Sequence, residues 1–446
     1  MKKDNSKPGI QNRNSFRVIS LGFLGMILAG ALLLMLPISS HDGSVTPFAD
    51  TLFTSISASC VTGLVVRDTA THWSLFGQII ILLLIQIGGM GVITIGLTVA
   101  RLSGKKIGLW FRGMMQDSIS APQVGGILQL TTFILKTTAI IELTGALLLY
   151  PVFARDFGAV KGIWYAVFHA VSAFCNAGFD LMGVREPFSS LTSYGSHIYV
   201  NIVVMLLIVM GGIGFLTWDD LLQNKHHFKK YRLQSKVVLV TSGILILVPA
   251  VFFFFLEYAD QPMQERVLHS FFQSVTARTA GFNTADLSQM HEPGVMLMTV
   301  LMLIGGCSGS TAGGMKTSTI AVLFLAALSV FRRRNDVECF KRRIPTDIIR
   351  TAGAILFMYL VLFLTTGIAI SEIESLPLIP CLFETGSALG TAGLTVGITT
   401  SLSMPSHIIL MILMFAGRVG GLTLIYAAFS SGNDTAKLPQ EKITVG

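Results

Sequence analysis

Residues Phe53–Leu64 read Phe-Thr-Ser-Ile-Ser-Ala-Ser-Cys-Val-Thr-Gly-Leu, and the same pattern occurs three more times along the chain. In each copy a Phe precedes a Gly by ten residues, mostly small residues lie between them, and Leu or Phe directly follows the Gly. The four glycines are Gly63, Gly178, Gly281 and Gly393, spaced almost evenly over the 446 residues. An internal repeat of this length predicts four structural units of similar size.

The composition is that of a membrane protein. Hydrophobic residues make up 52% of the chain and charged residues 13%, about half the charged share of a soluble domain. Most of the long apolar runs suffice for a helix that crosses a bilayer, which takes roughly 20 residues. We therefore predict an all-α, multi-pass membrane protein. The runs are Val18–Leu36, Ile79–Val99, Leu128–Leu149, Ile198–Leu216, Val237–Phe255, Val295–Ile304, Ala352–Ile370 and Ile408–Phe429.

The placement of the basic residues explains the net charge of +8. Lys and Arg are concentrated before residue 18 and in segments 101–112, 225–236 and 332–350. These are alternate connections between apolar runs, so the positive-inside rule predicts that they and both termini are cytoplasmic, in a protein of the cell membrane. This topology leaves no reason to infer a nucleic-acid partner. Docking of an acidic partner on the arginine clusters stays an alternative.

Each quarter of the chain is predicted to contain a spanning helix, a short helix, a glycine loop and a returning helix. These four tandem helix–pore loop–helix repeats are residues 1–115, 116–230, 231–340 and 341–446. The short helices, such as the 13 residues Pro47–Ser59, cannot cross a bilayer and are predicted to be re-entrant. We therefore expect eight spanning helices and four half-crossings. The returning segments are expected at Thr71–Arg101, at His197–Leu222, on a path that begins near Pro293, and at Ser406–Ser430.

The glycine loops predict a pore. Non-helical backbone at membrane depth is tolerated only where protein buries it or where it lines a water-filled cavity. Four such loops around one axis would direct carbonyl groups, and the negative C-terminal ends of the short helices, toward the centre. Both features favour a desolvated monovalent cation. The alternative is that each Gly only caps a short helix. The candidate filter residues are Val61, Thr62, Gly63, Asn176, Ala177, Gly178, Thr279, Ala280, Gly281, Thr391, Ala392 and Gly393.

This pattern resembles the Trk/Ktr/HKT superfamily of cation transporters over essentially the whole chain. The filter glycines of that family correspond to the four repeated glycines. In plant HKT relatives a Ser in the first loop accompanies sodium transport, so Gly63 at that place implies a preference for potassium. The first repeat begins close to Met1, without the extra helix pair of the Trk type, so the chain is most similar to the membrane subunit of the Ktr type.

The resemblance also implies partners and ligands. It implies a homodimer among the membrane lipids, resting on a cytoplasmic RCK-type (KtrA-like) regulatory ring that binds ATP and ADP. It implies K+ as the transported ion, bound only at the filter, with Na+ as a modulator and no covalent cofactor. Each loop has one glycine, where potassium channels have Thr-Val-Gly-Tyr-Gly, so we expect selectivity for K+ over Na+ to be real but weaker.

A second glycine motif lies on the returning segments. For the copies at Gly88–Gly91 and Gly211–Gly214 we favour close helix packing through small residues. In the third copy the glycines run into the polar sequence Cys307–Thr317, which has Gly-Lys-Thr character but is not a P-loop, since Met315 separates Gly from Lys. The 38 residues from Pro293 to Val330 would extend about 57 Å as a helix. A break is therefore predicted, and in the resembling family this segment is an intramembrane gating loop.

Arg418 replaces a glycine in the fourth copy, inside an apolar run. An intramembrane arginine costs at least about 2.5–3.5 kcal/mol and marks function by default. Facing the cavity, it would bind carbonyls of the 307–317 loop and repel cations. The alternative is a side chain that snorkels to the inner interface. The candidate gate residues are Gly305, Gly306, Cys307, Ser308, Gly309, Ser310, Thr311, Ala312, Gly313, Gly314 and Lys316, with Arg418 as their partner.

The sequence disfavours two other function classes. An alternating-access secondary carrier, such as a Na+- or H+-coupled K+ symporter, is disfavoured by fourfold rather than twofold repetition, although broken helices are typical of such carriers. An enzyme is disfavoured because no paired-carboxylate, Ser-His-Asp or zinc-ligand pattern is present in the sequence. The sequence therefore predicts a gated potassium uptake pore.

Overall fold

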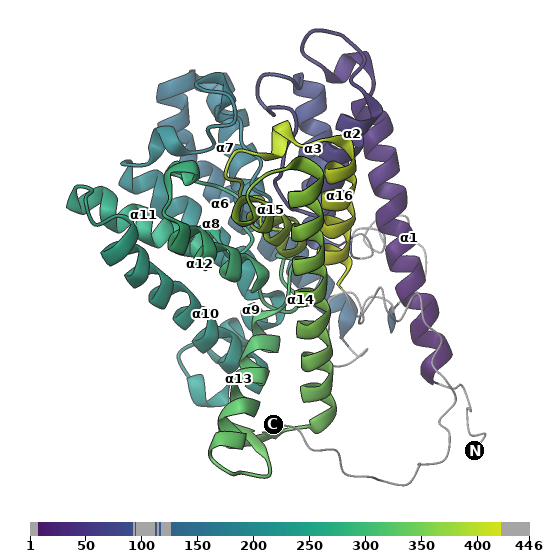
Figure 1. The fold of residues 1–446 in the computed structure, drawn as a ribbon, viewed down its shortest axis with the longest axis vertical. Helices are drawn as coiled ribbons and strands as arrows, with labels where there is room; N and C mark the ends of the chain where they lie inside the picture. Colours follow the sequence, from purple (N-terminus) through teal and green to yellow (C-terminus); the bar gives the residue numbers. More distant parts are fainter. Residues whose placement is uncertain (1–7, 92–93, 95–111, 114–115, 117–125, 421–446) are drawn as a thin grey trace.

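The computed structural model describes residues 8–91, 94, 112–113, 116 and 126–420. Most of this part is helical (Figure 1). The helices are α1 Pro8–Leu34, α2 Phe48–Ser59, α3 Leu75–Met90, α6 Ile127–Phe157, α7 Ala159–Phe174, α8 Ile198–Ile213, α9 Phe215–Asn224, α10 Leu233–Phe252, α11 Met263–Thr276, α12 Glu292–Leu303, α13 Thr317–Phe331, α14 Thr346–Glu374, α15 Leu378–Gly390 and α16 Met404–Val419. A π-helical turn, Phe253–Glu257, extends α10, and short 3₁₀ turns lie at Pro37–Ser39, Met182–Val184, Thr192–Tyr194, Phe228–Lys230, Leu287–Gln289 and Thr399–Ser401.

The order of helices repeats four times. Each quarter has a long helix (α1, α6, α10, α14), then a short one (α2, α7, α11, α15), a loop, and a returning helix (α3, α8, α12, α16). Among the described residues, these four long helices are the ones both long and apolar enough to cross a membrane alone, and the bent pair α8–α9 is a fifth candidate. Figure 1 shows α1 along one edge of the bundle and α15 near its middle. The boundaries of the four repeats remain a prediction.

The continuous returning helix expected at His197–Leu222 is wrong. Helix α8 ends at Ile213, Gly214 has φ 98°, and α9 leaves at an angle of 97°. The break is stable because another segment takes up the freed backbone groups: the carbonyls of Gly211 and Gly212 accept hydrogen bonds from the loop between α12 and α13. Helices α3 and α16 also end at glycines with positive φ, Gly91 and Gly420. These three glycines hold the same place in the repeated motif.

A two-stranded hairpin departs from the all-α expectation. Strands β1 (Val337–Cys339) and β2 (Arg342–Ile344) pair antiparallel within the basic connection between α13 and α14. The two turn residues, Phe340 and Lys341, both have positive φ, as a type I′ turn requires. The sequence signal for this hairpin is weak, because such turns usually contain Asn or Gly.

The core forms around the short helices. Phe53, Phe168 and Phe383, each ten residues before a repeated glycine, are at most 1% exposed. In the third copy the corresponding Phe271 is 38% exposed, and its neighbour Phe272 is the buried residue. The short helix of the third quarter is thus displaced by one residue relative to its glycine, so the third copy differs from the others within the repeated pattern itself.

Candidate functional site

The four glycine loops (residues 61–63, 176–178, 279–281 and 391–393) meet around one point. The atoms that a side chain on each glycine would meet belong to the neighbouring loops. A side-chain carbon built on Gly63 would lie 2.6 Å from the Ala177 carbonyl oxygen, and one built on Gly178 would lie 2.7 Å from the Gly281 Cα atom. These contacts join the first loop to the second and the second to the third.

The remaining contacts close the ring. A side-chain carbon on Gly281 would lie 2.9 Å from the Ala392 carbonyl oxygen, and one on Gly393 would collide with the Thr62 carbonyl oxygen. The group that crowds each glycine is thus the carbonyl that precedes the next glycine around the ring. The structure therefore brings the four glycines together, with the carbonyl oxygens of Thr62, Ala177, Ala280 and Ala392 beside them.

Two left-handed residues in each loop turn these carbonyls. The glycines have φ of 70° to 100°, a region that side chains with a Cβ rarely adopt. The residue two positions earlier is also left-handed although it is not glycine: Val61 (φ 57°), Asn176 (58°), Thr279 (68°) and Thr391 (52°). These four residues are among the predicted filter residues, but no sequence signal indicates their left-handed conformation, which the β-branched Val61, Thr279 and Thr391 disfavour. Strain of this kind is concentrated at functional sites.

The short helices hold the strained loops in place. The backbone N–H groups of Thr62, Ala177 and Ala392 donate to carbonyls near the helix ends at 2.7 to 2.8 Å, and that of Ala280 does so at 2.9 Å. Helix hydroxyl groups add further bonds: Ser172 Oγ donates to the Phe179 carbonyl oxygen at 2.7 Å. Ser172 is therefore a support for the second loop.

A cavity of about 280 Å³ lies on one side of the ring. The four glycines form part of its wall, together with the acidic residues Asp68, Asp180 and Asp286. The Asp68 carboxylate accepts hydrogen bonds from the backbone N–H groups of Thr71 and Phe188, at 2.9 Å each, so it also joins loops of two quarters. Carboxylates in such a cavity raise the local concentration of cations.

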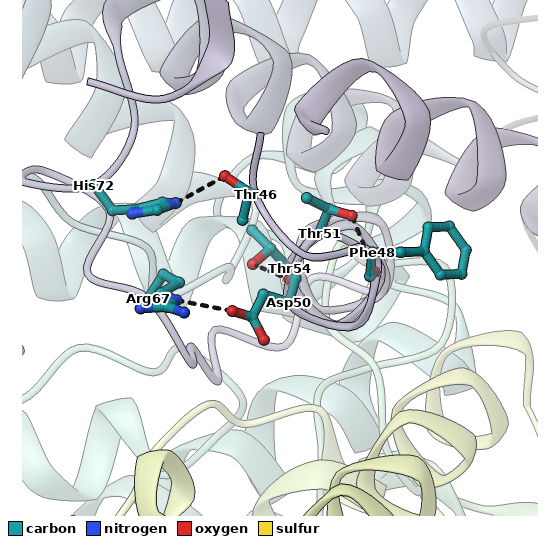
Figure 2. A network of polar contacts seen from close by, with 7 residues as sticks. All are labelled: Thr46, Phe48, Asp50, Thr51, Thr54, Arg67 and His72. Atoms are coloured by element: carbon teal, nitrogen blue, oxygen red, sulfur yellow. Dashed lines mark hydrogen bonds and ion pairs between the residues drawn. The ribbon is translucent and has the colours of Figure 1, made fainter. Parts of the chain in front are cut away.

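Other acidic residues near the first loop are structural. Asp50, at the start of α2, is paired with Arg67 at 2.8 Å (Figure 2). In the same view His72 Nε2 lies 3.0 Å from Thr46 Oγ1. Burial, and then the charge of Arg67, lower the pKa of His72, so its ring is neutral at pH 7. These contacts fix the start of the short helix relative to the chain that follows the first glycine loop.

The chain between α12 and α13, the α12–α13 loop (residues 304–316), is inserted between other quarters. Its Cys307 and Thr311 N–H groups donate to the carbonyls of Gly212 (3.0 Å) and Gly211 (3.3 Å), and Phe215 N–H donates to the Gly309 carbonyl (2.8 Å). These are the backbone groups of α8 and α9 that the break at Gly214 leaves free. The two irregular segments satisfy each other's hydrogen bonds.

The same loop touches two of the glycine loops. Thr311 Oγ1 lies 3.1 Å from Asn176 Oδ1 and 3.0 Å from the Phe174 carbonyl oxygen. A side-chain carbon on Gly313 would collide with Thr391 Oγ1, and one on Gly314 would lie 2.8 Å from the Gly390 carbonyl oxygen. The loop therefore lies directly against the second and fourth glycine loops.

The remaining candidate residues of the loop bond mainly within it. Lys316 Nζ donates to the Ala312 and Gly313 carbonyls (2.8 and 3.3 Å), and Ser310 Oγ donates to the Cys307 carbonyl (2.7 Å). The other contacts join the two ends of the loop: Ser308 Oγ with Ser318 Oγ, Thr317 N–H with the Gly306 carbonyl, and Gly305 packed against Gly313 and Gly314.

Arg418, near the end of α16, reaches this loop. One guanidinium nitrogen donates to the Thr311 carbonyl, and the other donates to the carbonyls of Gly88 (2.5 Å) and Gly89 (3.0 Å) at the end of α3. Within the described residues the guanidinium has no carboxylate partner in any salt bridge. Backbone carbonyl groups are therefore its hydrogen-bond partners next to the loop.

The glycines of the returning helices allow close packing. A side-chain carbon on Gly88, Gly211 or Gly417 would collide with the carbonyl oxygen of Ser59, Phe174 or Leu389, respectively, at the end of the adjoining short helix. Each returning helix can approach the glycine loops only because it lacks a side chain at this point.

A ring of carbonyl groups on short helices that end inside an apolar bundle is the architecture of membrane proteins that pass ions. The chain belongs to the TrkH family, whose description is "Cation transport protein" and whose model matches residues 2–442. It is therefore a multi-pass membrane transport protein and not an enzyme. The sequence prediction of this superfamily, and of an all-α membrane fold, is confirmed.

Similar proteins are found among bacteria. The potassium/sodium uptake protein NtpJ of Enterococcus hirae is 38% identical, with 96% of this chain and 97% of the relative covered. The Ktr system potassium uptake protein B of Bacillus subtilis is 36% identical, with 96% of each chain covered. The crystal structure of the potassium transporter TrkH from Vibrio parahaemolyticus matches with a TM-score of 0.74 at 17% identity, covering 96% of this chain and 86% of that one. The structural match supports the fold.

Proposed function

We propose that this protein takes up potassium across the cell membrane through a gated pore that prefers K+. The observation that carries the proposal is the closed ring of four glycine loops, in which four backbone carbonyls converge beside the glycines. Carbonyl oxygens replace the hydration shell of a K+ ion without adding a fixed charge that would trap it. The names of the similar proteins, potassium uptake proteins of Ktr systems and a potassium/sodium uptake protein, support the same ion.

The twelve loop residues are the proposed filter, with K+ as cargo and no covalent cofactor. The filter would be short, because each loop offers one glycine and one left-handed residue before it. A short filter discriminates K+ from Na+ less strongly than a long stack of sites, and this leaves room for Na+ as a modulator. The glycine at Gly63 supports K+ preference, following the resemblance to the wider superfamily.

The α12–α13 loop is the proposed gate. It packs against two filter loops, and Arg418 holds its Thr311 carbonyl. A guanidinium with no carboxylate partner repels a cation that leaves the filter. For ions to pass, the loop would have to release its hydrogen bonds to the end of α8 and to Arg418.

We further propose the orientation and the assembly. The basic connections, including the β1–β2 hairpin, would face the cytoplasm, where two copies of the chain would rest on an RCK-type ring that binds ATP and ADP. The connection between α13 and α14 carries Arg332, Arg333 and Arg334 before the hairpin and Lys341, Arg342 and Arg343 on it, and of these Arg334 and Arg343 are paired with acidic neighbours. The basic residues of this connection without an ion pair to another described residue are the proposed docking surface.

Growth at low potassium tests the function. We expect the protein to restore growth of a bacterial strain without its own potassium uptake systems when external K+ is limiting. The restoration should be stronger when a cytoplasmic regulatory subunit is expressed with it. An inserted, folded protein that never restores growth, with or without that subunit, would exclude potassium uptake.

A secondary carrier is the second candidate, because the bend between α8 and α9 and the interruption between α12 and α13 are breaks of the kind that carriers have. The two mechanisms differ in flux. A pore gives a K+ current that follows the potassium gradient and membrane potential alone, whereas a symporter stops when its coupling ion is removed. Flux into liposomes in Na+-free buffer at several pH values separates them.

A further inference from the structure

A buried arginine directly precedes the third filter loop. Arg278 is 6% exposed and immediately precedes the left-handed residue Thr279. The first, second and fourth loops have Cys60, Cys175 and Gly390 at this place. A guanidinium at membrane depth is costly unless polar groups surround it. The third quarter, which contains the proposed gate, is therefore also the one with a charge built into its filter loop.

The contacts of Arg278 lead to the gate. Its Nη2 donates to Ser242 Oγ on α10 at 3.1 Å and lies 4.0 Å from Cys307 Sγ, at the start of the polar part of the α12–α13 loop. Ser242 Oγ and Cys307 Sγ are 3.5 Å apart, and Thr317 Oγ1 donates to the same sulfur at 3.2 Å. The Cys307 sulfur thus contacts Arg278 next to the filter loop, Ser242 on α10 and Thr317 at the start of α13.

These polar groups form a cluster that is buried from solvent. Arg278, Ser242, Cys307 and Thr317 are all buried. Among the described residues, no salt bridge gives Arg278 a carboxylate partner, and its Nε has no hydrogen-bond partner. The hydroxyl of Ser242 and the sulfur of Cys307 are therefore the groups that stabilise its charge from the side of the gate.

The two arginines hold the gate at different points. Arg418 comes from α16 and binds the Thr311 carbonyl in the middle of the loop, whereas Arg278 comes from the filter and approaches Cys307. If the loop moved away, Arg278 would lose one of its few polar neighbours in an apolar site. Its side chain would have to follow, and its backbone is directly joined to Thr279 and Ala280 of the filter.

We propose that Arg278 is a positioning residue that couples the third filter loop to the gate through Ser242 and Cys307. The cluster holds the gate closed at its Cys307 end, and opening of the gate changes the geometry of the filter. This inference rests on the proposed function, because it assigns a regulatory contact to the same filter and gate. It predicts that a substitution outside the filter, at Cys307, changes ion selectivity as well as flux.

The test uses purified full-length protein in liposomes, with Rb+ uptake as the flux and the ratio of Rb+ to Na+ uptake as the selectivity. Cys307→Ala removes the acceptor, and Cys307→Ser keeps a polar atom there. We expect Cys307→Ala to raise Rb+ flux roughly two- to tenfold, the effect of losing one ordinary hydrogen bond. It should also lower the Rb+/Na+ ratio several-fold, whereas Cys307→Ser should stay near wild type.

Two further variants complete the design. Arg278→Lys should reproduce Cys307→Ala, because a lysine lacks the planar group that reaches both partners, and the double variant should add nothing further. A buried arginine can be needed for folding. If Arg278→Lys does not yield folded protein, the comparison of Cys307→Ala with Cys307→Ser tests the proposal. Cys381→Ala, at a fully buried cysteine of α15, is the control for the loss of a buried sulfur and should leave both readouts unchanged.

The outcomes are distinct. A folded Cys307→Ala protein with wild-type flux and selectivity would show that the cluster does not hold the gate closed at Cys307. Raised flux at unchanged selectivity overturns the coupling to the filter. If wild-type liposomes take up neither Rb+ nor K+, the proposed function itself fails, whatever the variants do.

Discussion

Val61, Asn176, Thr279 and Thr391 adopt left-handed backbone angles two positions before the four ring glycines. Each such residue costs of the order of 1–3 kcal/mol and persists only where the surroundings fix it. Here the surroundings are the short-helix carbonyls that bind the next N–H group and the neighbouring loops that leave no free space. The glycines and their neighbours could be predicted as filter residues because the pattern recurs. The left-handed conformation of the four non-glycine residues could not be predicted, because Val, Asn and Thr share no side-chain property that requires it.

Arg418→Ala tests the gate at this scale. The substitution removes three hydrogen bonds from carbonyls of α3 and the α12–α13 loop, and bonds from a charged donor contribute about 1.5–3 kcal/mol each. It also removes the charge that repels a cation. We therefore expect K+ flux to rise at least tenfold in liposomes, with Arg418→Lys intermediate because the charge remains. Unchanged flux and unchanged response to the regulatory subunit would mean that Arg418 is no barrier.

At the scale of elements, the returning segments show what a sequence pattern can and cannot indicate. The interruption after α12 could be predicted because polar residues and glycines occupy 305–317, where an apolar helix would continue. The bend at Gly214 could not, because the sequence around it remains apolar and its cause is distant. The α12–α13 loop pairs the freed groups of Gly211, Gly212 and Phe215.

Deleting Ser308–Gly313 tests the role of that loop. The deletion removes Gly309 and Thr311, and with them two of the bonds to α8 and α9 and the contact with Arg418. If the segment obstructs ions, K+ flux should rise and should no longer depend on the regulatory subunit. Size-exclusion chromatography and thermal unfolding in detergent provide the folding control. A folded deletion variant with lost or unchanged flux would exclude an obstructing loop.

At the scale of the whole molecule, four similar quarters form a ring, and the proposed gate and its arginine partners belong to the third and fourth quarters. The repeat in the sequence was enough to predict convergence of the glycines, and the apolar runs were enough to predict a membrane bundle. The unequal parts depend on single residues: Arg278 at the place of a cysteine or glycine, Arg418 at the place of a glycine, and Phe272 buried in place of Phe271. The contacts that these residues make depend on the neighbouring quarters, so their roles could not be predicted from the sequence.

The ratio of K+ to Na+ uptake by purified protein in liposomes, compared between wild type and Gly63→Ser, tests the central claim most directly. Gly63 has φ 100°, and a side chain there would press on the Ala177 carbonyl of the next filter loop. We expect wild type to prefer K+ and Gly63→Ser to lose most of that preference, with Na+ uptake raised. Wild-type and variant proteins with the same K+/Na+ ratio would show that the ring of glycine loops is not the selectivity filter.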